Sequence, residues 1–199
     1  MKTYLIRLMV IIGLSAGQSV FADTGDWLVR IGGHQVNPTS NNHDIVSVET
    51  GTMLTFTGTY FLSDSWAVEV LAALPFTHDI KLIGGSKVAD TKQLPPTLSM
   101  QYHFMPNNNI RPYVGAGVNV TLFFDEGTTG ALDDNHLSLG TSVGLAGQLG
   151  VDIDLTEKVF LNFDARYMNI STKAKLDGVS IGKVKIDPWV YGVSLGFRF

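Results

Sequence analysis

Apolar residues alternate with polar or small residues from Asp26 onward, in stretches of roughly ten residues separated by turn-forming residues. The last stretch shows this most clearly. One set of alternate positions there consists of Trp189, Tyr191, Val193, Leu195, Phe197 and Phe199. The positions between them hold Val190, Gly192, Ser194, Gly196 and Arg198. A period of two is typical of β-strands, because successive side chains point to opposite faces of the sheet.

The same alternation predicts eight strands. They are expected at residues 27–34, 54–62, 68–74, 98–104, 114–121, 144–155, 159–167 and 189–199. Short turns lie at 63–65, 106–109 and 156–158, whereas the joins near 37–48, 83–93, 125–138 and 177–182 are longer, polar and rich in Gly or Asn. Alternating short and long connections are typical of up-and-down barrels. We therefore predict an all-β fold for residues 23–199, an eight-stranded antiparallel up-and-down β-barrel.

The alternation leaves open which face of the barrel is apolar. A soluble, lipocalin-like barrel would place the apolar face inside, and a transmembrane barrel would place it outside. Two features favour the transmembrane barrel. The polar face carries mid-strand charges of both signs, which can pair inside a narrow barrel: Arg30, Glu69, Asp152, Asp164, Arg166 and Arg198. Aromatic residues recur near strand ends, as in the girdles at membrane interfaces: Trp27, Tyr60, Trp66, Tyr102, Phe104, Tyr167, Trp189 and Tyr191.

Composition narrows the classes of function. The chain has 199 residues, of which 45% are hydrophobic and only 16% charged, and this excludes a disordered protein. Its 14 basic and 18 acidic side chains argue against a nucleic-acid-binding protein, which needs a basic face. The sequence has no cysteine, so disulfides, thiol chemistry and cysteine-ligated metals are excluded.

Residues 1–22 have the pattern of a secretory signal peptide. Lys2 and Arg7 supply the positive start, residues 8–14 form the apolar stretch, and Val20-Phe21-Ala22 resembles a cleavage site. The alternative, an uncleaved membrane anchor, would need a longer apolar run. We expect the protein to be exported and cleaved after Ala22.

An eight-stranded barrel has room only for side chains or one small ligand. Near the short turns, strand parity points polar residues inward, and we expect them to form a salt-bridged plug: Arg30, Glu69, Gln101, His103, Gln148, Asp152, Asp164, Arg166 and Arg198. A proton or ion relay through the same residues is the alternative. Towards the other end the inward positions become apolar: Leu71, Ala73, Phe123, Met168 and Ile170. A hydrophobic solute could enter such a lining but could not continue straight through.

Two consecutive prolines precede the fourth predicted strand, in Leu94-Pro95-Pro96-Thr97, and Pro75 follows the third. Because proline has no N–H, the pair removes hydrogen bonds from the ladder. In one interpretation, the prolines hold a gap between the third and fourth strands, which would be a side exit into lipid at membrane height. In the other, they only end a loop.

Other candidate chemistry is weak. The five histidines share no metal-ligand spacing, and the acidic pairs at 125–126 and 133–134 depart from a calcium-loop pattern. Since no nucleophile and base can be paired, we expect no catalysis, no metal and no cofactor. Four lysines fall on the outward face near the far ends of the last two strands, where they either contact lipopolysaccharide phosphates or form a solvated rim: Lys173, Lys175, Lys183 and Lys185.

Residues 26–199 resemble the outer membrane protein W (OmpW) family, and specifically its AlkL-like, alkane-uptake branch. The matching blocks are DWLVR at 26–30, VEVLAA at 68–73 followed by PF at 75–76, KQLPPT at 92–97, RPYVGAG at 111–117, FFDE at 123–126 and DPWVY at 187–191. The likeness to the branch rests on TTGALD at 128–133 and AKLDGV at 174–179. The terminal Phe199 also resembles the C-terminal signal of bacterial outer-membrane barrels.

The resemblance implies a passive outer-membrane channel for small hydrophobic, alkane-like molecules, closed below and releasing them laterally between the third and fourth strands. The implied channel and lateral gate comprise Leu71, Ala73, Pro75, Leu94, Pro95, Pro96, Phe123, Arg166 and Met168, with Arg166 where some members carry an aromatic residue. The expected partners are outer-membrane lipids, lipopolysaccharide and hydrophobic solutes, with the protein a monomer or weak oligomer. The alternative function is a plugged structural or receptor barrel whose extracellular loops bind partners.

Overall fold

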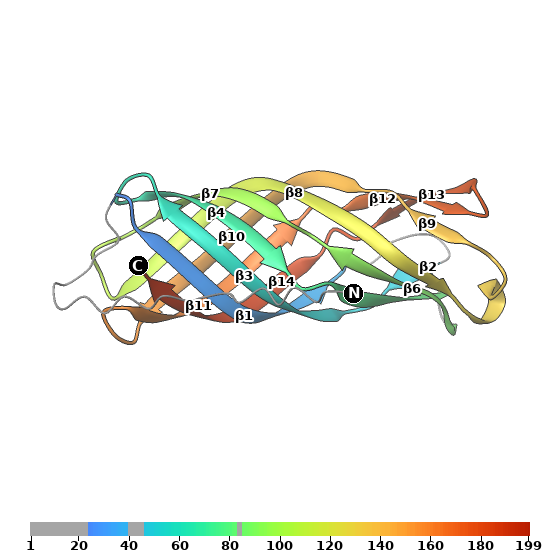
Figure 1. The fold of residues 1–199 in the computed structure, drawn as a ribbon, viewed down its shortest axis with the longest axis horizontal. Coiled ribbons are helices and arrows are strands. Elements are labelled where there is room, and N and C mark those ends of the chain that lie inside the picture. Colours follow the sequence, from blue (N-terminus) through green and yellow to red (C-terminus); the bar gives the residue numbers. More distant parts are fainter. Residues whose placement is uncertain (1–23, 40–45, 83–84) are drawn as a thin grey trace, which may run out of the picture.

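A closed antiparallel barrel forms the body of the protein in a computed structural model, which describes residues 24–39, 46–82 and 85–199 (Figure 1). Among these residues, eight strands make the wall: β1 (Trp27–Asn37), β3 (Gly51–Phe61), β4 (Trp66–Ala73), β7 (Thr97–His103), β8 (Ile110–Thr128), β10 (Ser142–Asp154), β11 (Val159–Met168) and β14 (Trp189–Arg198). Each strand pairs with its neighbour in the chain, and pairing between β1 and β14 closes the ring. The predicted eight-stranded up-and-down barrel is confirmed.

The apolar positions of the wall face outward, and the polar positions face the interior. In β4, Val70 is 54% exposed whereas its neighbour Glu69 is 0% exposed. Large apolar side chains are exposed on every strand of the wall, which is the reverse of a soluble barrel and the arrangement that lipid requires. Between residues 24 and 199, excluding 40–45 and 83–84, no helix is long and apolar enough to cross a membrane.

Aromatic side chains gather at both margins of the apolar band, as predicted. At the end that holds the C-terminus, Trp27 lies against Tyr60 with ring centroids 5.1 Å apart. At the other margin, Trp189 lies 5.4 Å from Tyr167. These pairs mark the two membrane interfaces.

Beyond the second margin the strands continue as a collar. The collar consists of β2 (Val46–Val48), β5 (Phe76–Leu82), β6 (Lys87–Leu94), β9 (Leu137–Leu139), β12 (Ser171–Leu176), β13 (Val179–Lys185) and the 3₁₀ turn η1 (Gly130–Leu132). β5 and β6 pair with each other, and β6 also pairs with the outer half of β8, while β9, β12 and β13 form a separate small sheet. The expectation that residues 83–93 and 177–182 are loops was therefore wrong for most of their length. Their backbone groups pair as strands, and Val88 and Ala89 of the first of these segments pack with Ile80 and Leu137 in a small core.

The expected signal peptide, residues 1–22, and residues 40–45 of the join near 37–48 lie outside the described residues.

Candidate functional site

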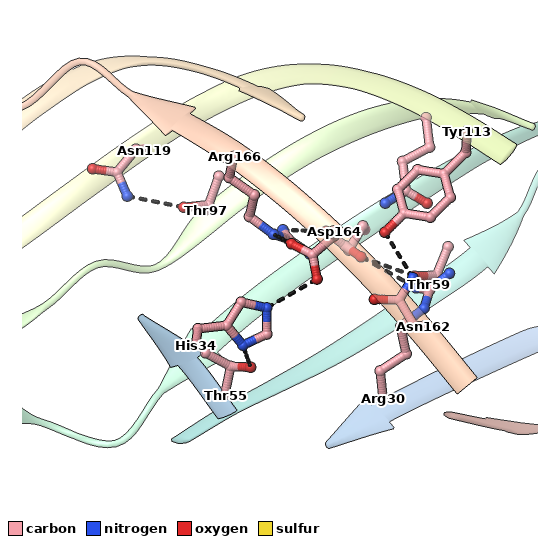
Figure 2. Close-up of polar contacts among 12 residues, drawn as sticks. Arg30, His34, Thr55, Thr59, Thr97, Tyr113, Asn119, Asn162, Asp164 and Arg166 are labelled. Atoms are coloured by element: carbon pink, nitrogen blue, oxygen red, sulfur yellow. Dashed lines mark hydrogen bonds and ion pairs between the residues drawn. The ribbon is translucent and has the colours of Figure 1, made fainter. Parts of the chain in front are cut away.

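A layer of ion pairs crosses the interior of the barrel (Figure 2). Glu69 of β4 lies 2.7 Å from Arg166 Nη1 and 3.3 Å from Arg30 Nη1. Arg30 also reaches Asp152 at 2.8 Å, and Arg166 Nε donates to Asp164 at 2.7 Å. β4 and β11 stand on opposite sides of the eight-stranded ring, so the contact between Arg166 and Glu69 spans the lumen. These five buried side chains form the predicted polar plug.

Four further side chains complete the layer. His34 contacts Asp164 Oδ2 through Nε2 at 2.9 Å and Thr55 Oγ1 through Nδ1 at 2.8 Å. The Asn162 amide donates to Asp152 at 2.8 Å and to the Tyr113 hydroxyl at 3.1 Å. His34, Thr55, Tyr113 and Asn162 were not predicted as members of the plug. His34 and Asn162 lie an even number of positions from a charged plug residue of the same strand, so parity marks them as inward. Thr55 and Tyr113 face inward because they are paired with inward positions of a neighbouring strand.

The rest of the predicted plug does not join this layer. Arg198 lies at the C-terminal mouth, where it contacts Asp154 at 3.3 Å and where Arg111 also pairs with Asp154. An apolar layer of Leu28, Phe61, Ala67 and Phe160 fills the barrel near this mouth. Arg198 therefore forms its ion pair with Asp154 at this mouth, beside the apolar side chains that fill part of the same end.

The remaining predicted plug residues, Gln101, His103 and Gln148, are buried. Gln101 Oε1 contacts His103 Nε2 at 3.0 Å, and the His103 ring stacks on Tyr113 with centroids 5.0 Å apart. Among the described atoms, neither polar atom of the Gln148 amide has a hydrogen-bond partner. These three side chains fill the lumen without a shared ionic contact.

Apolar side chains line the barrel on the far side of the plug. Leu71, Met168 and Ile170 are buried, as is Ala73, and Phe123 is partly buried. Leu71 follows Glu69 by two positions and Met168 follows Arg166 by two, so the apolar lining begins one step beyond the ion pairs. The lining of the interior therefore changes from polar to apolar at this level, and Arg166 lies at the base of the apolar part.

The β4–β7 ladder is interrupted at the prolines. Pairing between these strands ends at Leu71 and Thr97, and the hairpin resumes only at Phe76 and Gln93 in β5 and β6. The backbone in between bonds to the outer neighbours instead, since Leu74 donates to β3 at 2.9 Å and the Pro96 carbonyl accepts from β8 at 2.9 Å. The backbone on one side of the interruption is therefore hydrogen-bonded to β3, and the backbone on the other side is hydrogen-bonded to β8.

One amide holds the proline segment in place. Asn119 Nδ2 donates to the carbonyls of Pro95 and Pro96 at 3.2 and 3.3 Å, and to Thr97 Oγ1 at 2.9 Å (Figure 2). Pro95 is buried, Leu94 and Pro96 are half-buried and Pro75 is exposed. Asn119 was missed because nothing in the local pattern shows that an inward amide faces the carbonyls of both prolines.

Two small cavities lie on either side of Gln93. The outer one has a volume of about 20 Å³, room for about one water molecule, and its walls include His78, Phe123 and Ile186. The inner one is too narrow to admit a water molecule, and its walls include Pro95 and Met168. The side chain of Gln93 borders both, so it separates the collar from the space beside the interrupted ladder.

The four predicted lysines lie on the collar. Lys173 and Lys183 are directly opposite each other in the β12–β13 ladder, Lys185 is opposite Ser171, and all four lysines are exposed. Within the described part of the chain, Lys173, Lys175 and Lys183 have no carboxylate at ion-pair distance. Like charges directly opposite each other in a ladder are unfavourable unless an anion lies nearby.

The turn between β12 and β13 is fixed by a carboxylate. Asp177 accepts hydrogen bonds from the His136 backbone N–H at 2.8 Å and from Asn135 Nδ2 at 2.7 Å. The His136 hydrogen bond, with help from Asn135, holds the pKa of Asp177 below its usual range.

The model of the OmpW family matches residues 23–199. The chain belongs to the OmpW family. Outer membrane protein W of Vibrio cholerae is 37% identical over 219 aligned residues and both chains are covered completely. The crystal structure of OprG from Pseudomonas aeruginosa superposes with a TM-score of 0.80 at 37% identity, covering 89% of this chain and 97% of that one.

AlkL is a further relative. The AlkL of Ectopseudomonas oleovorans is 32% identical over 77% of this chain and 69% of its own. The solid-state NMR structure of AlkL in DMPC bilayers has a TM-score of 0.69 at 27% identity, covering 95% of this chain and 97% of that one. This OmpW-family protein is thus a Gram-negative outer-membrane barrel. Because such barrels keep their short turns on the periplasmic side, the collar is extracellular.

Proposed function

We propose that this OmpW-family protein is a passive channel for small hydrophobic molecules, which enter through the collar and leave sideways into the membrane between β4 and β7. The observation that carries the proposal is the interrupted ladder at Pro95 and Pro96, which lies directly beside the inner cavity. The relationship to AlkL supports the same class of protein.

The plug opposes a straight path to the periplasm. A hydrophobic solute moving past Leu71 would next meet Arg166 and Glu69, which join opposite walls at 2.7 Å. Separating buried ions from their partners costs several kcal/mol for each ion, and an alkane offers nothing in return. An apolar solute is therefore more stable above the plug than within it.

The interrupted ladder opposes lateral passage much less than the plug opposes passage to the periplasm. Parting a regular antiparallel pair breaks a row of backbone hydrogen bonds, each of which is expensive to leave unmade in lipid. At residues 72–75 and 94–96 no such row joins β4–β5 to β6–β7, because the groups that bond do so with β3 and β8. Side chains alone fill the space there, so rotation of a few side chains is enough to open it.

In the proposed arrangement, the collar lysines contact the outer leaflet of the membrane. Lys173, Lys175, Lys183 and Lys185 lie on one hairpin directly above β11 and β14. Lipopolysaccharide phosphates would neutralise the opposed Lys173–Lys183 pair as point charges. This contact would anchor the extracellular end and has no part in choosing the solute.

Uptake of radiolabelled octane tests the function. Cells that lack the protein are compared with cells that carry the wild type, the Pro95→Ala/Pro96→Ala variant, or Pro106→Ala as a control in a periplasmic turn. Folded protein is matched by the heat-dependent shift in gel mobility. We expect the wild type and Pro106→Ala to raise uptake and the double variant to lose most of the gain, because alanine restores two N–H donors to the ladder.

Two results would count against the proposal. If the wild type gives no gain over empty cells, hydrocarbon uptake is wrong, and the plugged receptor barrel with partner-binding loops takes its place. If the double variant transports as well as the wild type, the channel stands but the lateral exit at the prolines does not.

A further inference from the structure

An open groove lies on the lipid-facing side of the wall, across β3, β1, β14 and β11. Its sides include the outward side chains of Phe163, Tyr191 and Val193, which are 40–48% exposed. Gly33 contributes only backbone between them, and a methyl group added there would meet no atom within 4 Å. The groove has a volume of about 490 Å³, within the range of roughly 300–1,000 Å³ that small-molecule sites occupy. A hydrocarbon chain can therefore lie in this recess of the wall.

The extracellular end of the groove is polar. Gln35 and Thr52 border it and are directly opposite each other in the β1–β3 ladder, and Gln35 is also opposite Tyr191 in the β1–β14 ladder. Two positions further along β1, Asn37 is paired with Trp189 of the outer aromatic margin. Gln35 therefore lies just below the membrane interface, at the depth where carbonyl groups join the acyl chains of a lipid to its headgroup. The amide N–H groups of Gln35 can donate to such carbonyls.

Positive charge lies beyond the same strands, on the β12–β13 hairpin of the collar (Figure 1). Lys173 and Lys183 are exposed and directly opposite each other, whereas the alternate residues Thr172 and Val184 border the interior of the collar. The lysines therefore point outward, to the same side of the barrel wall as the groove. Six residues lead from Tyr167 at the aromatic margin to Lys173, a span of at most about 22 Å. One side of the barrel thus presents, in order, cations, an aromatic margin, polar side chains and an apolar groove.

We propose that this side of the barrel binds one molecule of lipid A, the acylated and phosphorylated anchor of lipopolysaccharide. A phosphate lies between Lys173 and Lys183, Gln35 donates to an acyl carbonyl, and one acyl chain lies in the groove over Gly33. The inference rests on the proposed lysine contact with the outer leaflet and extends it to a site that holds both ends of the lipid. A zwitterionic phospholipid fits less well, because its own ammonium group reduces what its phosphate offers to two opposed lysines. Since hydrocarbon surrounds the whole wall, the groove contributes close packing to the binding and no hydrophobic driving force.

Three ligands separate the phosphate contact from the acyl contact. Native mass spectrometry of the purified full-length barrel in detergent measures the binding of lipid A, of deacylated lipopolysaccharide, and of phosphatidylglycerol with acyl chains of the same length. Deacylated lipopolysaccharide reports on the lysines alone, because it has phosphates and no chain. Phosphatidylglycerol reports on whether any anionic lipid is enough. The same spectra show whether the protein is a monomer or a dimer.

Variants of the groove locate the site. Gly33→Leu fills the recess, and we expect it to weaken lipid A about threefold to tenfold without affecting deacylated lipopolysaccharide. Gly33→Ala fills less of the recess and should give a smaller loss. Gln35→Leu should cost about fivefold, the equivalent of one hydrogen bond. Gly147→Leu is the matched control, because Gly147 of β10 is also exposed with open space around an added methyl group, and it should change neither ligand. The heat-dependent shift in gel mobility shows that each variant is folded.

The lysines are tested separately. The Lys173→Gln/Lys183→Gln pair should weaken lipid A and deacylated lipopolysaccharide alike, because both ligands carry the phosphates. If the pair changes neither ligand, the proposed contact with the outer leaflet and this inference are both refuted. If the pair weakens both ligands while Gly33→Leu binds lipid A as tightly as the wild type, the outer-leaflet contact stands and only the groove is refuted.

Two other occupants of the groove would also overturn the inference. If the wild type binds phosphatidylglycerol as tightly as lipid A, and Gly33→Leu weakens both equally, the groove accepts any lipid chain. If Gly33→Leu instead converts a dimer into a monomer, a second copy of the protein occupies the groove. Octane uptake by Gly33→Leu should equal that of the wild type, because the groove lies across β3, β1, β14 and β11, whereas the interrupted ladder lies between β4 and β7. Failure of lipid A binding therefore leaves the proposed channel untouched.

Discussion

Replacing one arginine of the plug should destabilise the barrel more than replacing the carboxylate it contacts. Among the described side chains of this layer, two guanidinium groups, Arg30 and Arg166, face three carboxylates, Glu69, Asp152 and Asp164. These five ions together carry one excess negative charge. Arg166→Met raises the excess to two and leaves two carboxylates without their contacts at 2.7 Å. Glu69→Gln removes the excess and keeps an oxygen acceptor.

The magnitudes follow from burial. Removing one partner of a buried ion pair costs about 3–5 kcal/mol, because the other charge remains in a site without water. Both partners of the Arg166–Glu69 pair have at most 3% of their side-chain surface exposed, so the full range applies to Arg166→Met. For Glu69→Gln we expect about 1–2 kcal/mol, the difference between charged and neutral hydrogen bonds.

Urea unfolding in phospholipid vesicles at pH 8, followed by tryptophan fluorescence, measures both free energies. Lys92→Met is the control, because its ion pair with Asp125 is exposed and is worth at most about 1 kcal/mol. A loss for Glu69→Gln that equals or exceeds the loss for Arg166→Met would refute the charge count. The interior would then be stabilised by the geometry of individual contacts, whatever their total charge.

Four further predictions concern other parts of the barrel. Gly192→Ala should destabilise it by about 1–3 kcal/mol in the same assay, because the new methyl group would overlap the buried ring of His34. Gly33→Ala meets open space and should be neutral or stabilise by up to about 1 kcal/mol. The Lys173→Gln/Lys183→Gln pair should weaken binding to immobilised lipopolysaccharide about thirtyfold, and unchanged binding would indicate a solvated rim. The pKa of Asp177 is lowered, so its hydrogen bonds stabilise the folded state above the ordinary aspartate pKa and are lost as the pH falls through the lowered value. An NMR titration of the backbone amide that it binds should therefore have its midpoint below about 3.9, and a midpoint at or above that value would contradict the assignment.

Features of the site that depend on the alternation along one strand could be predicted from the sequence, whereas contacts between strands could not. Parity placed Leu71 and Arg166 inside correctly, because the face of a strand depends only on whether a position is odd or even. The same rule could not show that Arg198 belongs to a separate group at the periplasmic mouth. It also could not show that Asn119 binds the carbonyls of the proline pair, because the alternation of polar and apolar positions does not indicate which groups a side-chain amide contacts.

The sequence by itself determined the eight strands and their alternation, and it placed the missing N–H groups at Pro95 and Pro96, whose effect on the ladder it left open. These are local properties, set by the two-residue period and by the missing N–H of proline. Only the tertiary structure decided that Arg166 meets Glu69, which is 97 positions away in the chain. Which inward residues share a level depends on the stagger of all eight strands when the ring closes, and that stagger is a property of the whole barrel.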